Sequence, residues 1–258
     1  MTSSFLLVNG ISLFFATAGA GIPILYVHGN IGSSLWYSKV MEIPGHRTVA
    51  LDLPNFGRSD ALPGEVDLDR YADSLAAFIE AAGLDRPILV AHSLGGAVAQ
   101  SLAARRPELI RGLMLVDSAA PSGLKTPEER HPAIEMMRNN PQVLAYALKA
   151  VVPTLSDEVF FSALVEDAKK MAAPAWIGNA VALSRFDYTG RLDAFDKPVL
   201  VLWGRKDAIV TEAMARETLA AFPKARLEIL EELGHSPMAE DPDRFIDIVT
   251  AFAARCEK

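Results

Sequence analysis

The chain has 258 residues, of which half are hydrophobic, and a formal net charge of -7 at pH 7. This length suits a single α/β domain with one inserted segment and is enough to bury roughly three quarters of the unfolded surface. The negative charge and the absence of a basic stripe argue against a nucleic-acid partner. The single cysteine, Cys256, rules out an internal disulfide.

The first apolar stretch, residues 5–21, has the composition of a secretory signal but lacks a positively charged start, because the first basic residue is Lys39. Asn9-Gly10 lies between two alternating apolar runs and predicts a hairpin of antiparallel strands. No apolar run reaches the roughly 20 residues that span a bilayer. We therefore expect a protein without a membrane segment, located in the cytoplasm.

Runs of β-forming residues predict eight strands, near residues 4–8, 11–16, 23–27, 47–51, 87–92, 111–117, 198–203 and 225–230. Helical spacing separates most of the later strands, as at residues 69–82 and 97–106, which end at Gly83 and Pro107. This alternation predicts the α/β class, with an eight-stranded, mostly parallel sheet flanked by helices.

A polar loop, His28-Gly29-Asn30, follows the strand at 23–27 and leads to Trp36. Ligands of parallel sheets gather at the carboxyl ends of the strands. We expect the backbone N–H of Asn30 to serve there as a donor to an anionic oxygen, and Trp36 to line a pocket. In the next such loop, Asp52 and Asp60 are expected to be structural.

The segment 88–100 combines an apolar strand, a serine between small residues and a helix-forming run. A sharp strand-to-helix turn around a nucleophilic serine needs small residues two positions before and after it, and Ala91 and Gly95 flank Ser93 in this way. Ala91 departs by one methyl group from the usual G-x-S-x-G pattern. The backbone N–H of Leu94, at the start of the helix, is the second candidate donor to an oxyanion.

Residues 118–195 carry four helical runs and no strand signal, between the strands at 111–117 and 198–203. We expect a core domain formed by residues 1–117 and 196–258, with residues 118–195 as a helical cap over the serine. Met136, Trp176 and Phe186 of this cap are expected to line an apolar substrate pocket.

A serine nucleophile needs a histidine base and a carboxylate that orients it, and both follow late strands here. Asp207 lies in the loop after the strand at 198–203, and His235 lies in the loop after the strand at 225–230. Asp117 is a rival for the acid, because it also ends a strand. His92 is expected to face away from Ser93, since successive side chains alternate along a strand.

These landmarks together give the chain a resemblance to the α/β-hydrolases, in the capped branch of serine esterases, lactonases and carbon–carbon bond hydrolases. The matching motifs cover nearly the whole chain: H-G-N, L-D-L-P-N-F-G-R-S-D, A-H-S-L-G-G, L-V-L-W-G-R-K-D and G-H-S-P. The H-G-N loop is also similar to that of haloalkane dehalogenases, but those enzymes use an aspartate nucleophile where this chain has Ser93.

The resemblance implies hydrolysis of a small, largely apolar carboxylic ester or lactone through an acyl-enzyme, without a metal or organic cofactor. A first alternative is hydrolysis of a carbon–carbon bond in a dienoic or diketone acid, for which Arg185 or Arg191 would bind the carboxylate. A second alternative is a non-catalytic small-molecule receptor on the same fold. The sequence does not decide between monomer and homodimer.

Overall fold

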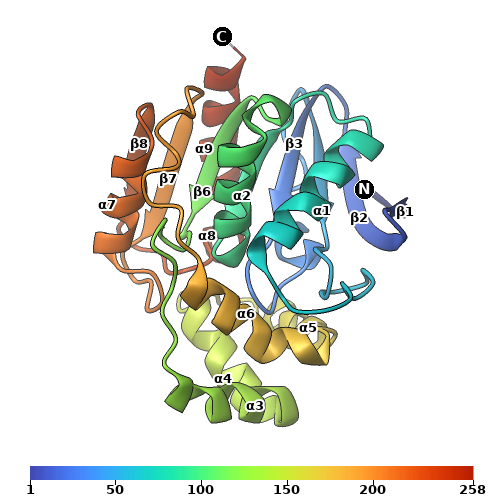
Figure 1. Ribbon diagram of the computed structural model, residues 1–258, viewed down its shortest axis with the longest axis vertical. Helices are drawn as coiled ribbons and strands as arrows, with labels where there is room; N and C mark the ends of the chain where they lie inside the picture. The colour runs from blue at the N-terminus through green and yellow to red at the C-terminus, as the bar shows by residue number, and fades with distance from the viewer. Residues whose placement is uncertain (258) are drawn as a thin grey trace.

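The computed structural model describes residues 1–257, which form one eight-stranded sheet with helices on both faces (Figure 1). The strand order is β1-β2-β4-β3-β5-β6-β7-β8. The strands are β1 (Thr2–Val8), β2 (Ile11–Gly19), β3 (Ile22–Val27), β4 (His46–Leu51), β5 (Ile88–His92), β6 (Gly112–Val116), β7 (Val199–Gly204) and β8 (Ala225–Leu230). The predicted fold class is therefore confirmed.

The antiparallel part of the sheet lies at its amino-terminal edge. β1 pairs with β2 and β2 with β4 in antiparallel fashion, and all later pairs are parallel. Asn9 and Gly10 connect β1 to β2 with φ angles of 51° and 81°. Positive φ at both central residues is typical of the hairpin turn that matches the strand twist, which explains the Asn-Gly pair.

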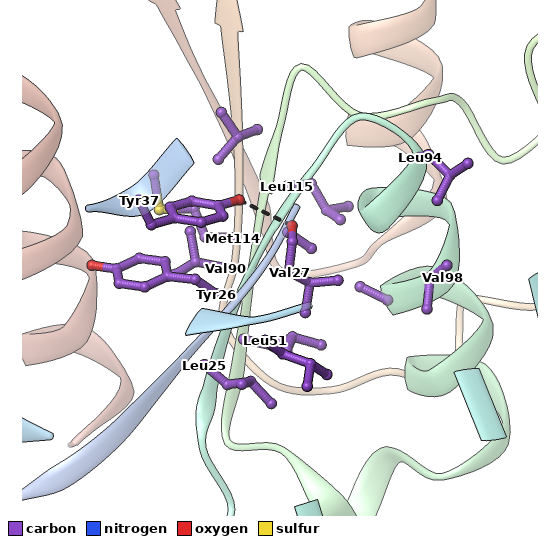
Figure 2. Close-up of a cluster of buried hydrophobic side chains, with 14 of the residues drawn as sticks. Leu25, Tyr26, Val27, Tyr37, Leu51, Val90, Leu94, Val98, Met114 and Leu115 are labelled. Carbon is purple, nitrogen blue, oxygen red and sulfur yellow. Dashed lines mark hydrogen bonds between the residues drawn. The ribbon is translucent and has the colours of Figure 1, made fainter. Parts of the chain in front are cut away.

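The centre of the sheet is apolar on both faces. β5 and β6 are buried along their whole length, as expected for parallel strands covered by helices on each side. Figure 2 shows part of this core, where the Tyr37 hydroxyl donates a 3.0 Å hydrogen bond to the carbonyl of Val27 at the end of β3. The rings of Tyr37 and Tyr26 stack with centroids 4.6 Å apart. These contacts fix the carboxyl end of β3, and with it the start of the loop at His28, against the segment that contains Tyr37.

Helices α1 (Leu68–Ala81) and α2 (Leu94–Arg105) cover one face of the sheet, and α9 (Pro242–Cys256) lies behind the other (Figure 1). α1 begins where the Asp67 side chain accepts hydrogen bonds from the N–H groups of Asp69 and Arg70, and it ends before Gly83, whose φ is +61°. The remaining helices of the sheet domain are α7 (Glu212–Ala221) and α8 (Pro237–Glu240).

Residues 118–195, called the inserted segment below, hold the helices α3 (His131–Asn139), α4 (Pro141–Val151), α5 (Glu158–Ala168) and α6 (Ala173–Arg185). A proline stands in the first turn of α3, α4 and α6, where its missing N–H costs no hydrogen bond. The four helices lie together at the end of the sheet toward which the parallel strands point (Figure 1).

Within residues 1–257, none of the helices combines the length and the apolar character needed to cross a membrane.

Candidate active site

Ser93 occupies the turn between β5 and α2 in a strained backbone conformation, with φ 53° and ψ -117°. Such a conformation typically costs about 1–3 kcal/mol and persists where the surrounding structure enforces it. Gly95 makes the turn possible, because a Cβ at this position would lie 2.4 Å from the carbonyl oxygen of His28. The Ala91 methyl is fully buried, so the turn accommodates the departure from the usual glycine.

His235 and Asp207 form a hydrogen-bonded pair, with 2.7 Å between His235 Nδ1 and Asp207 Oδ2. The other carboxylate oxygen of Asp207 accepts the N–H groups of Ile209 and Val210, at 2.6 and 3.0 Å. Three hydrogen bonds therefore fix the carboxylate of Asp207. With Nδ1 engaged, Nε2 is the imidazole nitrogen left for proton transfer.

Asp117 lies beside this pair but makes a different contact. One of its oxygens accepts the N–H of Gly204 at 2.8 Å, and the other has no partner among residues 1–257. Burial and the neighbouring charge of Asp207 raise the pKa of the Asp117 carboxyl well above its usual range. The pKa shift favours the protonated form of Asp117, and the geometry favours Asp207 as the partner of His235.

His92 lies on the same side as Ser93, so the expectation that it faces away is wrong. Its Nε2 lies 2.8 Å from the carbonyl oxygen of His235, and the two imidazole rings are 4.7 Å apart. Strand alternation does not carry across the turn, because Ser93 leaves the extended conformation. Burial lowers the pKa of His92 well below its usual range, so a neutral imidazole donates to His235.

The loop after β3 packs directly against the turn at Ser93. A Cβ on Gly29 would lie 2.8 Å from both Ser93 Cβ and His92 Nδ1, so only glycine fits there. The backbone N–H groups of Asn30 and Leu94 have no hydrogen-bond acceptor within the described part of the chain. Unpaired donors at a helix start and an adjoining loop are the arrangement that stabilises an oxyanion.

A cavity of about 560 Å³ lies between these loops and the inserted segment. Ser93, His235 and Asn30 line it together with Trp36 and Trp176, so the two tryptophans expected at the pocket do lie there. Most of the other lining residues are apolar, among them Ile134, Met137, Ala147, Leu148, Val151, Ala180, Leu183 and Ile209. Size and composition match a site for a small, largely apolar molecule.

Two other side chains expected at the pocket lie elsewhere. Met136 is 56% exposed on α3, and its neighbour Met137 lines the cavity instead. Phe186 stacks on Tyr188 and lines a different surface depression. Adjacent positions of a helix differ by about 100° in direction, so an apolar pair does not show which member faces the pocket.

The cations at the cavity also differ from those expected. Arg185 pairs with Glu65 at the surface, and neither Arg185 nor Arg191 lines the cavity. Lys125 and Arg130, which sequence reasoning did not single out, do line it. By contrast, Asp52 is structural as expected, since it accepts the backbone N–H groups of Ser34 and Arg58.

Comparison with known proteins agrees with this geometry. Residues 24–248 match the model of the alpha/beta hydrolase family. The chain belongs to this family. The match begins within β3 and covers all of the later strands to β8 and the inserted segment between them.

Three relatives illustrate the range of the family. The hydrolase is 28% identical to the AB hydrolase superfamily protein YisY of Bacillus subtilis, over 94% of this chain and 96% of that protein. It is 25% identical to a 2-hydroxy-6-oxononadienedioate/2-hydroxy-6-oxononatrienedioate hydrolase of Pseudomonas sp., over 96% and 93% of the two chains. A thermophilic esterase from Thermogutta terrifontis superposes with a TM-score of 0.80 at 25% identity, with both chains fully covered.

Proposed function

We propose that this hydrolase is a serine hydrolase that cleaves a small, largely apolar carboxylic ester or lactone. The observation that carries the proposal is the 2.7 Å hydrogen bond between His235 and Asp207, beside a cavity that Ser93 also lines. Ser93 lines the cavity, where its hydroxyl can meet a substrate. Contacts between such groups commonly tighten only when substrate binds.

The proposed reaction begins when His235 Nε2 removes the proton of Ser93 Oγ as that oxygen attacks the substrate carbonyl. The N–H groups of Asn30 and Leu94 stabilise the negative charge that develops on the carbonyl oxygen. His235 then returns the proton to the departing alkoxide, which leaves an ester of Ser93. Water, activated by His235, attacks this acyl-enzyme and releases the acid and free Ser93.

The cavity supports the substrate class. Its volume of about 560 Å³ and its aliphatic and tryptophan lining suit an acyl or alcohol group without charge. The inserted segment supplies much of this lining, so it acts in this proposal as a lid whose opening admits substrate and water.

Turnover of p-nitrophenyl esters from acetate to decanoate, and of aliphatic lactones, tests the proposal. We expect serine-dependent hydrolysis, with Ser93→Ala reducing kcat by about three orders of magnitude or more while the unfolding midpoint stays close to that of the parent. Activity of Ser93→Ala above about a hundredth of the parent value would contradict the assignment of the nucleophile. Absence of turnover for every probe would favour the receptor alternative.

Lys125 and Arg130 favour a second candidate, hydrolysis of a carbon–carbon bond in a dienoic keto acid. Both cations line the cavity. The Pseudomonas relative bears the name of a hydroxy-oxo dienoic diacid hydrolase. A dienoic keto acid belongs in the same assay, because turnover of this compound alone, lost in Arg130→Ala, would support the second candidate.

A further inference from the structure

A chain of hydrogen bonds crosses the interface between the sheet domain and the inserted segment. The N–H of Leu62 donates to Asn55 Oδ1 at 2.9 Å, and Asn55 Nδ2 donates to the Tyr71 hydroxyl at 2.8 Å. Tyr71 in turn donates to Asn179 Oδ1 at 3.1 Å, and Asn179 Nδ2 donates to Asn30 Oδ1 at 2.8 Å. Asn179 lies on α6, whereas Tyr71 lies on α1 and Asn30 in the loop after β3.

Both ends of this chain are backbone N–H groups, which can only donate, so the orientation of every amide in it is determined. The donor at Leu62 makes Asn55 Oδ1 an acceptor and turns Nδ2 of Asn55 toward Tyr71. At the other end, the N–H of Ile31 donates to Asn30 Oδ1 at 3.1 Å. Turning the amide of Asn179 around would place its Oδ1 against Asn30 Oδ1, and turning Asn30 as well would place Asn30 Nδ2 against the N–H of Ile31.

Burial makes such a reversal costly. Asn179 and Tyr71 are fully buried, and burial raises the pKa of Tyr71 to about 12, so the hydroxyl keeps the proton that it donates. A buried polar atom that loses its partner costs about 1–3 kcal/mol. The interior therefore holds Asn179 with its Nδ2 toward Asn30.

The consequence appears at the active site. Asn30 Oδ1 accepts two hydrogen bonds, from Asn179 and from Ile31. Asn30 Nδ2 has no partner within residues 1–257, and Asn30 lines the cavity beside Ser93. The amide thus carries free N–H donors at the cavity, on the residue that follows the glycine packed against Ser93.

We propose that the Asn30 side-chain amide donates a hydrogen bond to an oxygen of the substrate's reacting carboxyl group, and that Asn179 is a positioning residue that sets the direction of this donor. This inference rests on the proposed serine-hydrolase function. It adds a side-chain donor to the backbone donors of Asn30 and Leu94. It also makes the donor depend on the packing of α6 against the loop after β3.

A double-mutant cycle with Asn30→Ala and Asn179→Leu tests this. Asn30→Ala keeps the backbone N–H but removes the amide, and we expect kcat to fall by about a hundredfold, as for loss of one oxyanion donor. Asn179→Leu is expected to lower kcat by about tenfold with a smaller change in KM. Because Asn179 acts through Asn30, adding Asn179→Leu to Asn30→Ala should cause little further loss.

The matched control is Asp167→Ala. Asp167, on α5, accepts a hydrogen bond from the Ser33 hydroxyl, so it joins the same loop to the inserted segment without contacting Asn30. Its effect should be additive with that of Asn30→Ala. If Asn179→Leu does not fold, Tyr71→Phe interrupts the same chain one bond earlier, with an expected loss of about three- to tenfold in kcat.

Substrates with different leaving groups identify the oxygen that accepts the bond. An equal loss in Asn179→Leu for p-nitrophenyl and ethyl esters of one acid points to the carbonyl oxygen, and a larger loss for the ethyl ester points to the leaving oxygen. A loss from Asn179→Leu that is as large in the Asn30→Ala background as in the parent overturns the proposal. Ser93→Ala, assayed in parallel, tests the serine-hydrolase function separately, because its outcome does not depend on either asparagine.

Discussion

At the scale of single residues, two buried carboxyl groups lie near His235 with different hydrogen-bond partners. One carboxylate oxygen of Asp117, one of Asp207 and one imidazole nitrogen of His235 all lie within 4.8 Å of one another. Burial and the neighbouring charge of Asp207 both raise the pKa of the Asp117 carboxyl. Asp207 accepts three hydrogen bonds from N–H groups, whereas Asp117 accepts one.

The two carboxyl groups should respond differently to the same substitution. Asp207→Asn presents an amide to His235 and disturbs the imidazole tautomer, so we expect kcat to fall by about four orders of magnitude. Asp117→Asn replaces a carboxyl whose pKa is raised by an amide of the same shape, and its kcat should stay within about tenfold of the parent. Ester hydrolysis by both variants measures this, and the larger loss in Asp117→Asn would reverse the assignment.

The raised pKa of Asp117 also predicts a pH dependence of stability. The unfolded carboxyl ionises near its ordinary value of 3.8, while the folded one keeps its proton to higher pH. Between these two pKa values folding takes up a proton, so the contribution of Asp117 to the free energy of unfolding falls as pH rises. The asparagine side chain of Asp117→Asn does not titrate, so this pH dependence is absent from the variant. Its stability relative to the parent should therefore increase with pH above about 4, by at most about 1.4 kcal/mol per pH unit.

Urea unfolding of both proteins between about pH 5 and pH 8 checks this expectation. Asp193→Asn, at an exposed position, is the control for the loss of one acidic group. A stability difference between Asp117→Asn and the parent that does not change with pH would contradict a proton on Asp117.

At the scale of elements, the close approach of α2 to β3 places Ser93. Gly95 is the contact point, since its absent Cβ would lie 2.4 Å from the carbonyl oxygen of His28 and 2.8 Å from that of Val27. Both are backbone atoms of a strand end and its loop, which cannot move without shifting the sheet. The strain at Ser93 is therefore maintained by packing between two elements rather than by the turn alone.

Gly95→Ala should destabilise the protein. The methyl forces α2 away from the loop after β3, and overpacking of this kind costs about 1–3 kcal/mol in spite of the higher helix propensity of alanine. Gly178→Ala in α6 is the matched control, because the atoms nearest its Cβ, at 2.7 and 2.9 Å, belong to the side chain of Val66 and not to the backbone of a strand end. Urea unfolding midpoints compare the two variants, and an equal or larger loss in Gly178→Ala would contradict the role assigned to Gly95.

At the scale of the whole molecule, the cavity exists because the sheet domain and the inserted segment enclose it together. Ser93, His235 and Trp36 come from the sheet domain, and Trp176 comes from the inserted segment. The proposed catalytic groups thus come from the sheet domain, whereas much of the apolar wall comes from the inserted segment. The inserted segment can change the shape of the pocket without disturbing the strand ends that hold the proposed catalytic groups.

A large side chain on the inserted segment should therefore change substrate preference more than chemistry. Ala147 lines the cavity from α4, and Ala147→Phe should shift the optimum of the p-nitrophenyl ester series toward shorter acyl chains, with kcat for acetate kept within about threefold. The adjacent Tyr146 is 84% exposed, and Tyr146→Ala is the control that should leave the chain-length profile unchanged. An unshifted profile in Ala147→Phe would place the acyl chain elsewhere.

Much of this molecule follows from local signals in the sequence. Apolar runs followed by turn residues locate β5 and β7, alternation of apolar and charged residues locates β8, and small residues around Ser93 indicate the sharp turn. The places of Asp207 and His235 follow as well, because parallel strands bring their carboxyl ends to one edge. These features depend on short-range sterics and on periodicity, which a linear pattern records.

The tertiary structure alone decided the details that depend on contacts between distant elements. The roll of α3 about its axis turns Met137, not Met136, toward the cavity, and the break of strand alternation at Ser93 brings His92 beside His235. The contact of Asn179 with Asn30 also has no local signal: Asn179 is a polar residue within the mostly apolar α6, and Asn30 lies 149 positions away in the sequence. Side-chain direction at such positions results from packing across an interface, which no local pattern specifies.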